Sequence, residues 1–180
     1  LVPTMALAQR SGLGDLADAH LSVPTDKGAN AGLKVTSLVA GMVAGADSID
    51  DLDVVRSGGM KTLFDGVYAP STIGTLLREF TFGHARQLES VLREHLAELC
   101  ARVDLLPGAS ERAFIDIDSL LRPVYGHAKQ GASYGHTKIA GKQILRKGLS
   151  PLVTTISTAT GAPVIAGARL RAGKANSGKG

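Results

Sequence analysis

The stretch that decides the fold is Arg112-Ala-Phe-Ile-Asp-Ile-Asp118. Apolar and polar residues alternate in it, and this pattern predicts a β-strand over Ala113 to Asp118, with successive side chains on opposite faces. The period of two places Phe114, Asp116 and Asp118 on one face and two isoleucines on the other. The sequence therefore predicts a strand that carries two carboxylates about 7 Å apart on one face.

Two interpretations of these carboxylates are open. Burying an unpaired carboxylate costs several kcal/mol, so acids within an apolar strand usually lie at its end, pair with a cation or bind a metal. Carboxylates that hold a hard divalent cation are typical of phosphoryl-transfer sites. Asp116 and Asp118 are therefore either metal ligands or acids at a strand end that face solvent or nearby lysines.

Further strands are expected after this one. Leu152 to Ser157 is rich in β-branched residues, and Pro163 to Leu170 is another short apolar run. Between the first strand and these, His127 to Lys142 is expected to be a long connection rich in Gly, Lys, His and Tyr. We predict an α+β chain, with a helical region over residues 1–108 and a region of three strands over residues 109–180.

The pattern before about Leu106 is helical. Between Leu88 and Val103 apolar residues recur every three or four positions, which predicts an amphipathic helix of about five turns that ends by Pro107-Gly108. A broader apolar surface between Leu33 and Val43 predicts a second helix, which we expect to be buried. Small neighbours such as Gly41 would allow close packing there.

Shorter helices are expected between these two. Ser48 and Asp51 have the spacing of a capping box, and Pro70 begins a short helix through Phe80. These helices are compatible with a helix-turn-helix in which Thr72 to Phe82 reads DNA, and Arg78 is then the best-placed side chain for a base edge. The alternative is that they only pack around a core.

Charge is distributed unevenly along the 180 residues, whose net charge is +4. Residues 1–118 have a net charge of −6, whereas residues 119–180 have ten basic residues and no acid, and Asp118 is the last acid of the chain. Clustered cations gain free energy by releasing phosphate counterions, so duplex DNA is the expected partner. An alternative is that a part of the domain outside this sequence supplies balancing acids. The candidate DNA contacts of this half are Lys129, Gln130, Lys138, Lys142, Arg146 and Lys147.

Composition excludes several other classes of protein. Hydrophobic residues make up 44% and mean hydropathy is +0.11, as expected for a folded chain. The single cysteine, Cys100, rules out an internal disulfide and a multi-cysteine zinc site. His127 and His136 fit solvent or phosphate contacts better than metal ligation. The uncharged stretches 35–46 and 148–168 do not fit membrane spans, so we expect no membrane partner. A single cysteine gives no indication of an oxidising compartment, so we expect a cytoplasmic location.

The segment Gly173-Lys-Ala-Asn-Ser-Gly-Lys-Gly180 imitates a phosphate-binding loop. It follows an apolar strand and fits Gly-x-x-x-x-Gly-Lys, but its eighth position is Gly180, so the hydroxyl that would reach magnesium is missing. A flexible basic turn is the preferred interpretation.

Five stretches carry a family resemblance in the same order along the chain. They include Phe114-Ile-Asp-Ile-Asp-Ser119 and Tyr125-Gly-His-Ala-Lys-Gln-Gly131, together with residues 28–51, 69–84 and 162–171. Taken together they resemble insertion-sequence DDE transposases of the thirteen-eighty type. The resemblance extends over nearly the whole chain, which makes it more specific than any single motif.

The resemblance implies a ribonuclease H-like catalytic domain that opens with a strand, a hairpin and a third strand. In that family two Asp and one Glu hold two divalent ions, Mg²⁺ or Mn²⁺. The first Asp corresponds to Asp118, but Ser119-Leu120 departs from the common Asp-x-Thr, so Asp116 is a second candidate. The other two carboxylates are expected beyond Gly180, so the resemblance implies that the chain is an amino-terminal fragment.

The implied parent function is cut-and-paste DNA transposition. Activated water cleaves the phosphodiester at the element end, and the freed 3′-hydroxyl attacks target DNA. Because two carboxylates are missing, we expect the fragment alone to be inactive. The alternatives are a non-enzymatic DNA-binding product, which occupies element ends or pairs with the complete transposase and inhibits it, and an inert pseudogene product. The partners expected from the resemblance are transposon ends and target DNA, with self-association on DNA.

Overall fold

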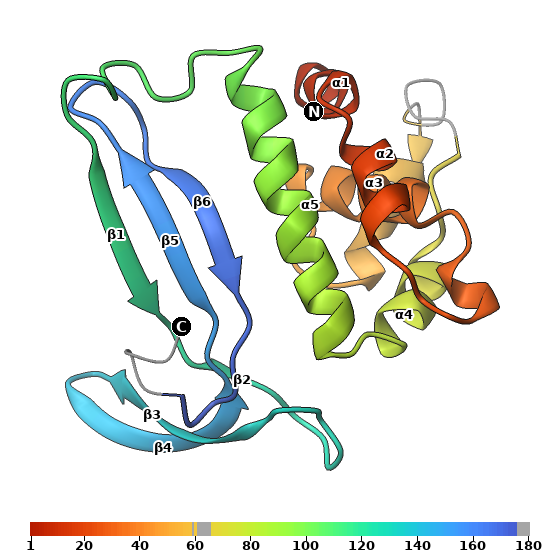
Figure 1. Cartoon of the computed structure of the whole chain (residues 1–180). Coiled ribbons are helices and arrows are strands. Elements are labelled where there is room, and N and C mark those ends of the chain that lie inside the picture. Colours follow the sequence, from red (N-terminus) through yellow and green to blue (C-terminus); the bar gives the residue numbers. More distant parts are fainter. Residues whose placement is uncertain (59, 61–65, 176–180) are drawn as a thin grey trace. The chain divides into compact units, whose positions relative to one another are not determined.

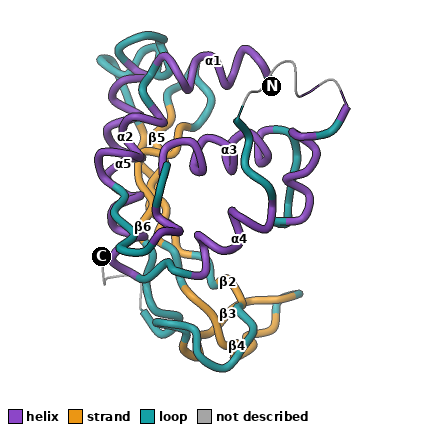
Figure 2. Tube along the Cα trace, turned by 90° about the vertical axis from the view of Figure 1, so that its right-hand side faces the viewer, coloured by secondary structure: helices purple, strands orange, loops and turns teal. Residues whose placement is uncertain are grey.

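Two structural units make up the chain in the computed structural model (Figure 1). The first spans Leu1–Arg102 and the second Val103–Gly180. The structure describes residues 1–58, 60 and 66–175. Among the described residues the helices all lie in the first unit and the strands in the second. Figure 2 shows the helices in purple and the strands in orange. The α+β organisation predicted from the sequence is therefore confirmed.

The first unit is built from short helices followed by one long helix. Proline stands in the first turn of α1 and α4, where its missing N–H leaves no helical hydrogen bond unmade. Gly12, with φ of 76°, separates α1 from α2 in the left-handed region that favours glycine. No helix among the described residues is long and apolar enough to cross a membrane. The bounds are α1 Val2–Arg10, α2 Leu13–His20, η1 Asp26–Gly28, α3 Ala31–Val43, η2 Asp50–Arg56, α4 Pro70–Arg78 and α5 Phe82–Cys100.

Side-chain caps fix two of the helix starts. The predicted capping box before η2 is present, because the Ser48 backbone N–H donates to Asp51 Oδ2 at 3.0 Å and the Asp51 N–H donates to Ser48 Oγ at 3.4 Å. The Ser48 hydroxyl, which donates to Asp51 Oδ2 at 2.6 Å, is the main cause of a lowered Asp51 pKa, followed by a hydrogen bond with the Asp47 side chain and by the Ser48 backbone N–H. At the start of α5, the Thr81 N–H donates to His84 Nδ1 at 3.0 Å while the Thr81 side chain caps in return. The predicted long helix is therefore confirmed, but it ends at Cys100 and leaves Val103 outside.

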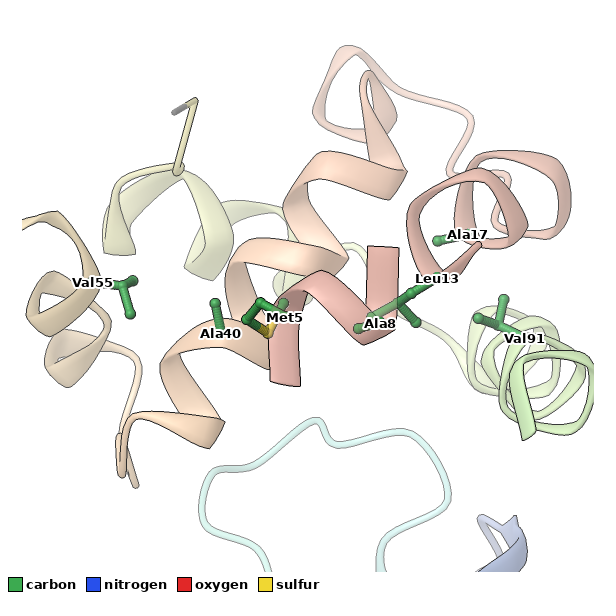
Figure 3. Packing of buried hydrophobic residues seen from close by; sticks show 7 residues of the cluster. All are labelled: Met5, Ala8, Leu13, Ala17, Ala40, Val55 and Val91. Atoms are coloured by element: carbon green, nitrogen blue, oxygen red, sulfur yellow. The ribbon is translucent and has the colours of Figure 1, made fainter. Parts of the chain in front are cut away.

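The core of the first unit is assembled from four of its helices and η2 (Figure 3). Helix α5 contributes Val91 to this core, and η2 contributes Val55, which is fully buried. Ile73 of α4 is also fully buried. The cluster shown in Figure 3 consists of Met5, Ala8, Leu13, Ala17, Ala40, Val55 and Val91.

Helix α3 makes its closest contacts through small residues, and Val35 and Val39 are half-buried against the core. A methyl group on Gly32 would overlap the carbonyl oxygen of Gly14, and one on Gly41 would overlap the Leu52 side chain. By contrast, Met42 is 62% exposed. The close packing predicted at Gly41 is present. The expectation of a helix buried along its apolar surface was wrong in part, because Val35 and Val39 pack against the core whereas Leu33, Met42 and Val43 are exposed.

The second unit contains two antiparallel sheets. One has the strand order β1-β5-β6 and the other β2-β4-β3. Strands β1, β5 and β6 match the three that were predicted, and in the pairing of β5 with β6 the register shifts between Thr154 and Thr155. The bounds are β1 Phe114–Ser119, β2 Arg122–Pro123, β3 Ser133–Ile139, β4 Lys142–Leu149, β5 Leu152–Ser157 and β6 Val164–Arg169.

The expected connection over His127 to Lys142 is wrong in its second half, because this part belongs to a β-hairpin. Strands β3 and β4 pair from Ser133 opposite Gly148 to Ile139 opposite Lys142. Ala140 and Gly141 form the turn with φ of 48° and 78°, and two positive φ values match the right-handed twist of a two-residue hairpin. Alanine seldom adopts this conformation, so the sequence signal for the turn was weak.

Candidate functional site

The two aspartates lie on β1, an edge strand of its sheet. Asp116 is opposite Thr155 and Asp118 is opposite Val153 on β5. Directly opposite residues point to the same side of an antiparallel pair, so both carboxylates share one face, as the alternation predicts. The intervening Ile117 points to the other face.

Both carboxylates are exposed. Asp118 Oδ1 accepts a hydrogen bond from the backbone N–H of Ser119 at 2.7 Å. Because these acids stay in contact with solvent, they do not incur the desolvation cost that would demand a cation. Among the described residues there is no group of three His, Cys, Asp or Glu side chains that could hold a metal ion. Asp116 and Asp118 thus present two oxygen-bearing groups but do not by themselves make a metal site.

The structure places the predicted DNA contacts in different settings. Lys129 and Gln130 lie in the segment before β3, and Lys138 lies near the tip of β3. Lys142 and Arg146 lie on β4, and all five are exposed.

Lys147 differs from the other basic residues of the hairpin because its side chain is half-buried. Its Nζ donates to the carbonyl oxygens of His127 at 3.3 Å and Gly126 at 3.5 Å. A hydrogen-bonded ammonium of this kind holds the 126–127 loop against β4. It has less freedom to reach a phosphate than the exposed lysines have.

Register divides the hairpin residues between two faces. Lys138 is directly opposite Gln143, and His136 is directly opposite Leu145, so these four share one face. The other face has Gly135 opposite Arg146 and Ile139 opposite Lys142. The predicted basic residues therefore lie on both sides of one ribbon, and Gln143 and Leu145 join them although sequence reasoning had not singled them out. The pairing across an X-Gly turn was the signal that could have found them.

Arg78 lies in the other unit, at the exposed end of α4. A methyl group on Gly74 would lie 3.5 Å from Arg78 Nη1, so the guanidinium folds back over its own helix. The expectation of a reading helix over Thr72 to Phe82 was wrong in extent, because α4 ends at Arg78 and α5 begins at Phe82. Part of the segment that leads into α4, residues 59 and 61–65, lies outside the described residues.

Of the segment 173–180, whose sequence resembles a phosphate-binding loop, residues 176–180 lie outside the described residues. Gly173 itself is buried. A methyl group on it would overlap the carbonyl oxygens of Ser133 and Gly148. This glycine is therefore needed for packing against the hairpin.

Comparison of the chain with protein-family models, with curated proteins and with solved structures gave no match.

Proposed function

We propose that this chain is part of an insertion-sequence DNA transposase of the DDE type, and that its second unit binds duplex DNA. The observation that carries the proposal is the position of Asp118. It lies on the first strand of the antiparallel β1-β5-β6 sheet. It is also the last acid of the chain, and residues 119–180 after it contain ten basic residues. A ribonuclease H-like domain opens with three strands, of which the second and third form a hairpin. The antiparallel pairing of β1 with β5 and of β5 with β6 supports this assignment.

The transposase chemistry requires more than the described residues supply. Two carboxylates offer fewer oxygens than the six or so that Mg²⁺ takes, so we expect the chain alone to bind Mg²⁺ or Mn²⁺ weakly. When bound at a complete site, the metal would polarise the scissile phosphate. The role proposed for Asp118, or for Asp116 in the alternative register, is to supply one carboxylate to that site.

Excision of a marked element tests the catalytic part of the proposal. The reading frame that contains this sequence, taken with any coding sequence adjoining it, supplies the protein. We expect Asp118→Asn to abolish excision while DNA binding is retained, because an amide keeps the shape and removes the charge. Loss of excision with Asp116→Asn but not with Asp118→Asn would move the first catalytic carboxylate to Asp116. Full excision by both variants would overturn the proposed role of β1.

Salt dependence tests the DNA-binding part. Lys129, Lys138, Lys142 and Arg146 are the exposed cations of the hairpin region, and four neutralised phosphates imply a slope of log affinity against log salt of about −3.6. Gel retardation of a random-sequence duplex across salt concentrations measures this slope. The absence of retardation at low salt by folded protein would contradict DNA binding.

The second candidate function is a non-enzymatic DNA-binding or inhibitory product, favoured by the absence of a three-ligand cluster among the described residues. It shares the DNA-binding surface and lacks catalysis. Retardation without excision in any extended form of the reading frame would support it, and neither retardation nor excision would support an inert product.

A further inference from the structure

The β3–β4 hairpin is a two-stranded ribbon along most of its length. Its neighbour β2 pairs with β4 only at the base, where Arg122 is opposite Leu149 and Pro123 is opposite Gly148. The Val124 N–H extends this contact to the carbonyl oxygen of Lys147 at 3.3 Å. Beyond that point β4 has only β3 as a strand neighbour among the described residues, and Figure 1 draws the pair as a long curved ribbon.

Close backbone packing holds the base of the ribbon. A methyl group on Gly135 would overlap the carbonyl oxygen of Gly173, and one on Gly148 would overlap the carbonyl oxygen of Arg122. The Lys174 N–H donates to Ser133 Oγ at 2.8 Å. The segment after β6 therefore lies against the face that contains Gly135, and the base is fixed by contacts that tolerate no side chain.

The opposite face is open towards the tip of the ribbon and carries side chains there that can recognise bases, whereas at the base Lys147 holds the 126–127 loop. Its outer pairs are Lys138 with Gln143 and His136 with Leu145, all of them exposed. Tyr134 continues this face towards the base and is 64% exposed. Lysine can donate to guanine O6 and N7, glutamine can pair with adenine N6 and N7, and an apolar side chain can contact a thymine methyl group.

Charge favours the approach of this ribbon to a polyanion. From Ser133 to Leu149 the hairpin has four Lys or Arg residues and no Asp or Glu. Lys142 and Arg146 lie on the other face, exposed on β4. Cations on both faces of a ribbon can contact phosphates on both sides of a nucleic-acid groove, because a phosphate backbone borders the groove on each side.

We propose that the β3–β4 hairpin enters the major groove of duplex DNA, with Lys138 and Gln143 reading base edges and Lys142 and Arg146 contacting phosphates. The inference rests on the proposed DNA-binding function and names the element and residues that give it sequence preference. The major groove, about 12 Å wide, admits a two-stranded ribbon. The deep, narrow major groove of duplex RNA does not admit side chains, so DNA is the partner.

Groove occupancy is the first test, carried out with the full chain and a random-sequence DNA duplex. We expect methyl green, a major-groove ligand, to displace the protein, and netropsin, a minor-groove ligand, to leave most of it bound. A duplex RNA of the same sequence should bind more weakly. Displacement by netropsin alone, or equal binding of the RNA, would overturn the proposal.

Base reading is the second test, by selection from a randomised DNA duplex library. Gln143→Ala should lose about 5- to 150-fold of discrimination at one base position, the range of one bidentate base contact, while affinity for random DNA stays nearly constant. Lys142→Ala should weaken all sequences alike and reduce the salt slope by about 0.9. Gln9→Ala, an exposed glutamine on α1 of the other unit, is the matched control and should change neither.

The outcomes separate the two proposals. Binding without an enriched sequence, or an enriched sequence unaffected by Lys138→Ala and Gln143→Ala, overturns groove reading and leaves DNA binding in place. No binding to any duplex overturns both. Circular dichroism spectra and melting temperatures that match the parent protein establish that each variant is folded, as expected for exposed positions.

Discussion

Different interactions stabilise the helical unit, Leu1–Arg102, and the stranded unit, Val103–Gly180. Every buried hydrophobic residue among those described belongs to the helical unit, from Met5 to Val91. In the stranded unit, Ile115 and Ile117 are each 64% exposed, and the buried positions are glycines or polar residues such as Ser150. The helical unit therefore gains most from the hydrophobic effect, whereas the stranded unit depends on backbone hydrogen bonds and close glycine contacts. This difference shows that one chain can place its stability in one region and its candidate chemistry in another.

The largest expected difference between the units comes from truncating one isoleucine to alanine in each of them. Ile73→Ala should lower the free energy of unfolding of the helical unit by about 2 to 5 kcal/mol, because it opens a cavity at a fully buried position. Ile117→Ala should change the stranded unit by less than about 1 kcal/mol, because the side chain is mostly solvated. Denaturant unfolding with peptide-resolved amide exchange measures both. Equal losses would mean that β1 is covered in solution.

A smaller effect is expected from adding a methyl group at the hairpin base. Gly135→Ala should destabilise the stranded unit by about 1 to 3 kcal/mol, because the new group would overlap the Gly173 carbonyl. Exchange of the Lys174 amide, which donates to Ser133, should speed up. Gly167→Ala is the control, since its methyl group would meet only Thr154 Cβ at 3.9 Å. Unchanged exchange in the Gly135 variant would show that the base is not closely packed.

The smallest expected effect is a pH dependence confined to the helical unit. Burial lowers the pKa of His95, whose Nε2 lies 2.9 Å from Ser11 Oγ, against a weaker opposing effect of the Ala8 backbone. The unfolded chain then binds a proton more readily than the folded one, so stability falls as the pH drops below about 6.5. His95→Gln should flatten the dependence of unfolding free energy on pH between neutral and mildly acidic solution.

The control for this prediction is His127→Gln, at an exposed position in the stranded unit. It should leave the pH dependence of the helical unit unchanged. His20, which pairs with Glu94 at 2.9 Å, is present in all three proteins, so its own contribution cancels. A steeper dependence in the His95 variant would contradict a lowered pKa of the His95 imidazole in the folded protein.

Periodicity predicted the parts of the fold that follow one simple repeat. The stripe along α5 and the alternation in β1 were sufficient, because one face of each element differs in polarity from the other. The buried side of α3 could not be predicted in this way, since Gly32 and Gly41 are selected by the approach of another segment rather than by hydrophobicity. The hairpin was missed for a related reason: its strands are rich in Gly, Lys and His, and its turn uses Ala140.

The candidate site was predictable in part. The period of two placed Asp116 and Asp118 on one face, and the register with β5 agrees with that placement. Their exposure was not predictable, because it depends on what covers the sheet. The pairing of Lys138 with Gln143 depends on the turn position, and one residue of slip would have exchanged the faces of β4.

The glycine contacts at the hairpin base also have a mechanical consequence. Gly173 follows β6 in the chain and touches the backbone of both hairpin strands, at Ser133 and Gly148. Nearby, the Ser150 N–H donates to the Arg171 carbonyl at 3.0 Å, and Arg171 Nε donates back to the Ser150 carbonyl at 3.1 Å. A force applied at the tip of the ribbon is therefore transmitted through peptide groups rather than through rotatable side chains. The hairpin should respond as a stiff lever whose fulcrum lies beside β6.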